Sequence, residues 1–161
     1  MMKTTIIAFL FSASLAFAGK PITFQALSAG DTIYVTFRSS GCFGESDYEF
    51  TFHAKAFTVK VTQFWAHLVG PEKRLQQEKR VSLGTGSLYD AEIAGLDRLF
   101  MFYRLKQSGR CTTVNVISAT QKRGDALIAS ESFTDESCGT YDQPNLTLLP
   151  SIAPKAKPVT K

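Results

Sequence analysis

The sequence contains none of the short motifs that mark common catalytic or cofactor-binding sites. There is no Gly-x-Ser-x-Gly nucleophile elbow, no phosphate-binding glycine loop and no dinucleotide-binding fingerprint. The two histidines, His53 and His67, have no carboxylate or thiol beside them at the spacing of metal ligands. An acidic loop at residues 135–142 does not match the spacing of a calcium loop. The sequence therefore predicts no metal site and no cofactor.

Long apolar runs are also absent, except at residues 6–17. Lys3 precedes this run, which ends in the A-x-A pattern of Ala16-Phe17-Ala18, as in a secretory signal peptide that is cleaved after Ala18. The run is shorter than the roughly 20 residues that a membrane-spanning helix needs. No cysteine follows the cleavage site to carry a lipid anchor. We expect a signal peptide at residues 1–18 and a soluble, exported mature protein without a membrane span.

The mature chain has about 140 residues, the usual size of one domain. We predict a single domain at residues 19–144, followed by a proline-containing tail at residues 145–161. The tail begins apolar and becomes basic from Lys155 onward, where we expect disorder. The short signal with a single Lys favours a bacterial protein of the periplasm or the extracellular space.

The chain carries little excess charge, with a formal net charge of +4. Its densest basic cluster, at residues 72–80, includes Glu72 and Glu78, which partly neutralise it. This composition is typical of a solvated loop or hairpin tip. We expect no nucleic-acid binding.

Aromatic residues are abundant, with thirteen Phe, five Tyr and one Trp. Apolar and polar residues alternate in several segments, which is the pattern of a half-buried antiparallel sheet. The clearest segment puts Tyr48, Phe50 and Phe52 on one face. The alternation fails near Phe64-Trp65, which predicts a bulge or a strand end there. We expect strands at residues 21–28, 32–38, 47–54, 56–68, 80–83, 111–120 and 125–133.

One long segment, residues 88–108, has the spacing of an amphipathic helix. Ser87 is a suitable N-cap and Gly109 a suitable C-terminal stop, while the glycines at residues 84–86 predict a turn before the helix. Strands on both sides of a single helix indicate an α+β fold. We predict a mostly antiparallel sheet of about six to seven strands, with the helix packed on one face.

Three cysteines in an exported protein allow one intramolecular disulfide and leave one thiol. If the closing hairpin turns near residues 122–123, Cys111 lies opposite residues 134–135, and Cys138 is within reach. We therefore predict a Cys111–Cys138 disulfide and a free thiol at Cys42.

The predicted helix carries more apolar surface than packing on one sheet requires. Beyond its core face, Met101, Phe102 and Leu105 lie on the far side. Such a surface is covered by a partner or by the chain's own tail, whose large apolar residues are Leu146, Leu148, Leu149 and Ile152. The leading hypothesis is a non-enzymatic binding or interaction module of the cell envelope or secretome, with a protein or an envelope component as its partner.

Two alternatives remain open at this stage. One is a small exported enzyme, a hydrolase or a thiol-dependent catalyst, with a cleft between sheet and helix lined by Cys42, His53 or the 135–142 loop. The other is an apolar small-molecule cup formed by Tyr48, Phe50, Phe52 and the helix, although ordinary core is the commoner role of such aromatics. The sequence indicates neither the ligand nor the oligomeric state.

Overall fold

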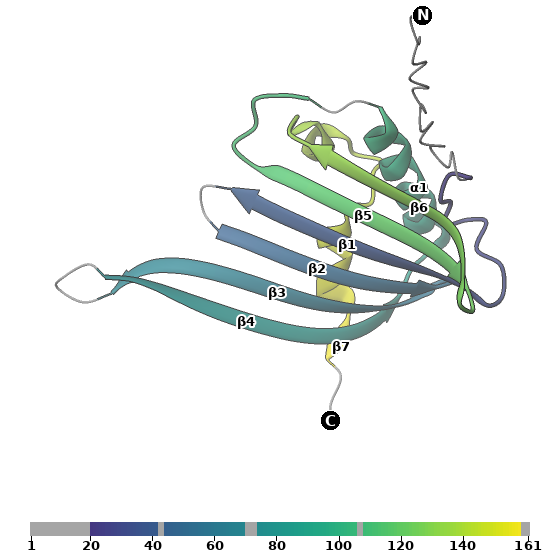
Figure 1. The fold of residues 1–161 in the computed structure, drawn as a ribbon, viewed down its shortest axis with the longest axis horizontal. Coiled ribbons are helices and arrows are strands. Elements are labelled where there is room, and N and C mark those ends of the chain that lie inside the picture. The colour runs from purple at the N-terminus through teal and green to yellow at the C-terminus, as the bar shows by residue number, and fades with distance from the viewer. Residues whose placement is uncertain (1–19, 42–43, 70–73, 106–107, 159–161) are drawn as a thin grey trace, which may run out of the picture.

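The computed structural model describes residues 20–41, 44–69, 74–105 and 108–158; the side chains of residues 65–69, 74–78 and 141 are outside this description. Seven strands form one antiparallel sheet in the order β6-β5-β1-β2-β3-β4-β7 (Figure 1). They are β1 (Asp31–Gly41), β2 (Gly44–His53), β3 (Ala56–Val69), β4 (Arg74–Ser87), β5 (Val114–Arg123), β6 (Ala126–Asp135) and β7 (Lys157–Pro158). The helical segments are α1 (Asp90–Arg104), α2 (Leu149–Ile152) and the short 3-10 turns η1 (Gly139–Asp142) and η2 (Ala153–Lys155). The predicted α+β fold is confirmed.

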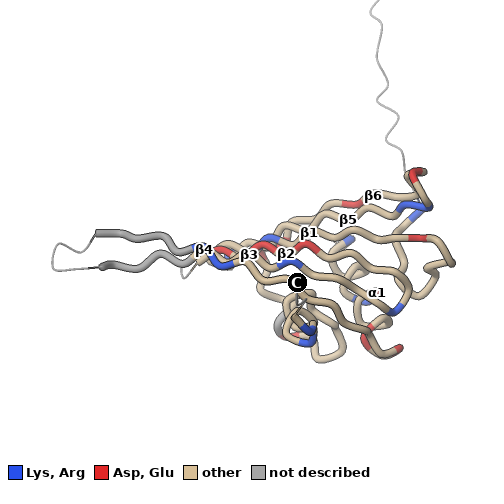
Figure 2. The backbone as a smooth tube through the Cα atoms, turned by 90° about the horizontal axis from the view of Figure 1, so that it is seen from below, with Lys and Arg blue, Asp and Glu red and all other residues tan. Residues whose placement is uncertain are grey.

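The core lies on one face of the sheet. Strand alternation decides which side chains enter it: Val35, Phe50 and Val59 are register partners on neighbouring strands, and each is at most 3% exposed. From α1, Leu96 and Phe100 are fully buried against this face. Burial of a side chain of this size stabilises the fold by about 1.5–3 kcal/mol. Figure 2 shows α1 and the C-terminal segment on the same side of the sheet, and no element of the described chain covers the other side.

The helix is shorter at both ends than predicted. Ser87 is not its N-cap, because Ser87 is still paired with Ala56 in the sheet. The helix begins at Asp90 after Tyr89, whose backbone N–H donates to the Glu92 carboxylate at 2.9 Å. It ends at Arg104, and Leu105 already has extended backbone angles. The prediction that the helix extends to residue 108 and stops at Gly109 was therefore wrong.

Gly109 has a different role from the predicted helix stop. A Cβ atom at Gly109 would lie 2.5 Å from the backbone oxygen of Glu136 and 2.7 Å from Cα of Ser137. Only a residue without a side chain allows this close approach of two loops. Gly109 is thus required by the loop after β6, and the sequence pattern alone could not separate this role from a helix stop.

Strand β4 is longer than predicted and includes the glycines that were expected to form a turn. A Cβ on Gly86 would lie 2.7 Å from the ring of Phe57, and one on Gly84 would lie 2.5 Å from Cβ of Ala156. Both glycines therefore make room for a neighbour within a regular strand. The expected bulge at Phe64-Trp65 is also absent, since β3 and β4 pair without a register shift from Ala56 to Val69. The irregularity lies instead between β5 and β6, at Gln121/Lys122.

The β3–β4 hairpin extends beyond its neighbour β2. The pairing of β3 with β2 stops at Phe64, opposite Glu45, whereas β3 pairs with β4 as far as Val69. The outer part is a two-stranded ribbon that projects from the sheet (Figure 1). Residues 74–80 of the predicted basic loop belong to this strand pair, and residues 70–73 lie outside the described chain.

The C-terminal tail is part of the fold as far as Pro158. Leu149 and Ile152 of α2 are at most 1% exposed and belong to the core. The Lys155 ammonium contacts the Glu92 carboxylate on α1. Lys157 and Pro158 pair with Thr85 and Gly84 as the edge strand β7. The expectation of disorder from Lys155 onward is thus wrong for residues 155–158, because β4 offers an unpaired edge and α1 a carboxylate.

Candidate functional site

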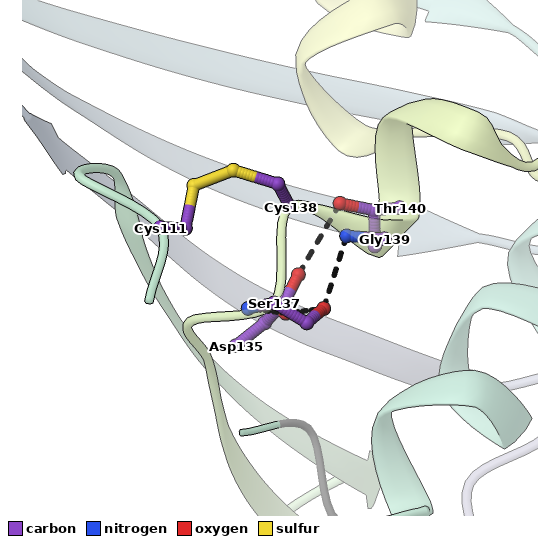
Figure 3. Close-up of a disulfide and its surroundings, with 6 residues drawn as sticks. All are labelled: Cys111, Asp135, Ser137, Cys138, Gly139 and Thr140. Carbon is purple, nitrogen blue, oxygen red and sulfur yellow. Dashed lines mark hydrogen bonds between the residues drawn. A yellow bond between two sulfur atoms is a disulfide. The ribbon is translucent and has the colours of Figure 1, made fainter. Parts of the chain in front are cut away.

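The predicted disulfide is present and lies beyond the C-terminal end of α1. Cys111 and Cys138 are joined, with their Cα atoms 5.6 Å apart (Figure 3). The backbone N–H of Cys111 also donates to the oxygen of Glu136 at 3.0 Å. The hairpin turns at residues 124–125 and its ladder ends where Asn115 faces Asp135, so the disulfide stands where the two strands separate. It therefore holds the loop after α1 against the loop after β6.

Asp135 organises the loop that follows β6. Its fully buried carboxylate accepts hydrogen bonds from the backbone N–H of Ser137 at 2.9 Å and from the hydroxyls of Ser137 and Thr140 at 2.5 and 3.2 Å (Figure 3). Ser137 Oγ in turn accepts from the N–H of Gly139. The carboxylate is thus used to fix the backbone of the loop. Among the described residues, no group of three or more His, Cys, Asp or Glu side chains is placed to hold a metal ion.

The three residues of the predicted interaction surface at the end of α1 differ in exposure. Met101 and Leu105 are 63% and 67% exposed. Phe102 is half-buried and packs against the core, with its ring 3.2 Å from the Cβ position of Gly139. The loop after β6 therefore covers Phe102 and leaves Met101, in the last turn of α1, and Leu105, directly after it, exposed.

The tail covers a different part of α1. Thr147 packs directly on Gly95, where an added Cβ would lie 2.0 Å from its hydroxyl oxygen. Asn145 accepts a hydrogen bond from Nε of Arg98 at 2.8 Å. The tail's buried residues, Leu149 and Ile152, enter the core. Coverage by the tail thus reaches the middle of the helix and does not extend to Met101 and Leu105.

An N-terminal segment that was predicted as a strand is instead bound like a peptide. Asp97 accepts the backbone N–H groups of Phe24 and Gln25 at 2.6 and 3.1 Å. Arg104 donates to the backbone oxygen of Ile22, and the Glu131 carboxylate accepts the backbone N–H of Ile22. The side chains of Ile22 and Phe24 are 1% and 4% exposed. No strand forms at residues 21–28, because these backbone groups bond to side chains and not to a neighbouring strand.

A line of polar residues on α1 is the feature of the sequence that could have indicated this contact. Asp90, Asp97 and Arg104 are seven residues apart and share one side of the helix. Asp97 and Arg104 hold the N-terminal segment, and Arg104 also forms an ion pair with Glu131 at 2.7 Å. This bond to the carboxylate raises the pKa of the Arg104 guanidinium, although desolvation acts against it.

Of the residues proposed for a thiol–histidine pair, His53 alone has a described side chain. His53 lies on the open face of the sheet, where its Nδ1 is 3.0 Å from the hydroxyl of Thr32. This face is opposite to α1, so His53 does not line a cleft between sheet and helix. Cys42, predicted to be a free thiol, and the side chain of His67 lie outside the described residues.

The cup suggested by the aromatic strand is filled by core side chains. The ring of Phe24 stands edge-on to Phe52 and to Phe100, with centroids 5.2 and 5.1 Å apart. Phe50 and Phe52 are at most 2% exposed. These aromatics form the interior of the domain.

Within the described chain, no helix has the length and apolar character needed to cross a membrane. The fold and the disulfide define the protein as a disulfide-containing α+β domain with one open sheet face. Comparison of the chain with protein-family models, with curated proteins and with solved structures finds no match.

Proposed function

We propose that this protein is a non-enzymatic binding module of the cell envelope or secretome, and that a protein partner docks on Met101 and Leu105. The observation that supports this proposal is the exposure of these two side chains at the C-terminal end of a helix whose large apolar residues from Ile93 to Phe100 are buried. Apolar side chains that a rigid part of a fold holds at the surface can serve as anchors of a protein interface.

The surroundings favour a partner that carries an acidic residue next to its apolar contact. Arg98 is exposed one turn before Met101 and forms no ion pair with any described residue. Arg110 is also exposed, beside the disulfide. A carboxylate at the rim of the partner would meet these cations and speed the encounter. The disulfide ties Cys111, six residues after Leu105, to the loop after β6, so this part of the chain loses less entropy on binding.

The test uses a photoreactive amino acid placed at Met101 in the full-length protein, in the cells that export it. We expect one discrete cross-linked protein, and we expect the same label at Leu127 to give none. Leu127 is a matched control because it is a large apolar residue with 64% exposure on β6. Identical products from both positions, or none from Met101, would contradict the proposal.

The captured protein is then purified and titrated against the wild type and Leu105→Glu. We expect Leu105→Glu to weaken binding about tenfold or more, since loss of an interface anchor costs over 1 kcal/mol. Leu127→Glu should bind as the wild type does. Equal affinity of the Leu105→Glu variant and the wild type would show that the cross-link was adventitious.

A further inference from the structure

A hollow of about 590 Å³ opens at the corner of the sheet where β3, β4 and β7 meet. This volume lies within the range of small-molecule sites. The polar residues that line it are His53, Thr58, Thr85, Ser87, Lys155 and Lys157. No carboxylate is among its lining residues. The hollow is therefore suited to a ligand that carries negative charge and many hydroxyl groups.

The cations of the hollow are not equally available. Lys155 already has partners within the domain: its ammonium contacts the Glu92 carboxylate and lies 5.7 Å from the ring centroid of Tyr89. Lys157 is exposed and forms no ion pair with any residue of the described ranges. His53 bonds to Thr32 through Nδ1, and Nε2 is its second polar atom. Lys157 and His53 are thus the groups that can meet an anion.

Thr58 and Thr85 also belong to a row of hydroxyl side chains that crosses the open face of the sheet. Each member lies directly opposite the next in the strand register, in the order Ser130, Thr120, Tyr34, Thr51, Thr58 and Thr85. Strands are about 4.8 Å apart, so the row spans about 24 Å. It is a continuous line of donors and acceptors that ends in the hollow.

Threonine is common on the solvent side of a sheet, and the next register row of this face also carries hydroxyls, at Ser132, Ser118 and Thr36. On β2 and β3 the positions beside the hydroxyl row carry ion pairs instead, with Lys60 to Glu49 at 2.6 Å. The carboxylate of Glu49, two residues from Thr51 on β2, is therefore already paired with a cation. Lys122, near the other end of the row, lies 5.8 Å from the ring centroid of Tyr34.

We propose that the hollow and the hydroxyl row together bind an acidic polysaccharide. Carboxylates of the sugar chain meet Lys157 on one side of the hollow and His53 on the other, and sugar hydroxyls exchange hydrogen bonds with the row. Tyr34, which is 45% exposed, offers a ring face against which a sugar ring can pack. The hydroxyl row lies on the sheet face opposite to α1, so binding along it is independent of the docking of a protein partner on Met101 and Leu105.

The test titrates the protein with hexagalacturonate, as an acidic probe, and with maltohexaose, as a neutral one, at low and at physiological salt. We expect the acidic probe to bind more tightly, with an affinity that falls as salt rises. The amide NMR signals of Thr58, Thr85 and Lys157 should shift most on binding. Preference for the neutral probe, or no binding of either probe at millimolar concentration, would overturn the proposal.

Variants separate the site from the remainder of the sheet face. The double variant Thr58→Val with Thr85→Val keeps the β-branched shape and should weaken binding about tenfold, from the loss of two hydrogen bonds. Lys157→Gln should weaken it about two- to fivefold and reduce its salt dependence. The control, Thr134→Val, is exposed on β6 at the far edge of the same face and should bind normally.

Thermal unfolding shows whether each variant is folded before it is titrated. A folded double variant with wild-type affinity would place the ligand elsewhere and refute the site. An equal loss of affinity in Thr134→Val would also refute it, because the effect would then be general to the sheet face.

Discussion

The carboxylate of Asp31 lies 2.6 Å from Nε of Arg123, its register partner on β5. The Asp31 side chain is 1% exposed, whereas that of Arg123 is 57% exposed. The guanidinium lowers the pKa of this carboxyl to about 2, despite the opposing effect of desolvation, and bonds from Ser28 and Gln121 act in the same direction. The pair joins the start of β1 to the end of β5.

We expect the Asp31–Arg123 pair to make stability depend on pH in the acid range. The pKa of Asp31 is lower in the folded chain than its ordinary value of 3.8, so its contribution is complete above that value. The contribution is lost as pH falls toward about 2, because the folded protein must then take up a proton. Urea unfolding at a series of acid pH values should show this decline. Asp31→Asn should be less stable at neutral pH and should show a smaller decline, whereas Asp125→Asn in the exposed hairpin turn should behave as the wild type.

The N-terminal segment should contribute strongly to stability. Phe24→Ala removes a buried ring that contacts Phe52 and Phe100, and we expect it to lower the free energy of unfolding by about 3–5 kcal/mol. Gln25→Ala is the control, because Gln25 is exposed and bonds to Asp97 through its backbone only. Chemical denaturation of both variants measures the difference. Equal stability of the two would mean that the segment does not pack in the core in solution.

The disulfide should stabilise the domain by constraining the unfolded chain. Cys111 and Cys138 are 27 residues apart, and closing a loop of this length contributes about 3–4 kcal/mol in the loop-entropy view. The double variant Cys111→Ser with Cys138→Ser should lose this stability, and the wild type should lose it on reduction. In the unfolded, unreduced protein, thiol titration should find one thiol per chain, at Cys42. A peptide map that links Cys42 to either partner would contradict the pairing.

The tail should be required for the stable fold. Truncation before Asn145 removes Leu149 and Ile152 from the core, and we expect a partly unfolded or self-associating product in sedimentation. Leu149→Ala alone should cost about 2–5 kcal/mol, while Gln143→Ala at an exposed site should cost little. If the truncated protein stays monomeric and fully folded, the tail is not needed for the fold and its packing on α1 does not stabilise the domain.

Features that depend on residues close in sequence could be predicted well. The alternation in β1 and β2 put Val35, Phe50 and Phe52 on the buried face, because successive side chains of a strand point to opposite sides. The disulfide also followed from local geometry, since one hairpin brings Cys111 near Cys138. Of the candidate surface residues, Met101 in α1 and Leu105 after its end are exposed, whereas Phe102 is half-buried; their role in an interface stays a prediction.

Features that depend on distant residues could not be predicted from the same patterns. Ile22 is ordered by Arg104 and Glu131, which are 82 and 109 residues away along the chain. The roles of Gly86 and Gly109 come from close approaches to Phe57 and Glu136, and glycine alone does not reveal what it approaches. The hydroxyl row exists only through the register of six strands, each of which carries an ordinary polar residue at that position.

The sequence by itself therefore determined the fold class, the buried face of the central strands and the pairing of two cysteines, because these follow from periodicity and short connections. Only the tertiary structure decided where α1 begins and ends, that the tail and the N-terminal segment complete the core, and which apolar residues stay exposed. The physical reason is that a helix end, an edge strand or a buried terminus is stabilised by what packs against it, and those contacts come from far along the chain.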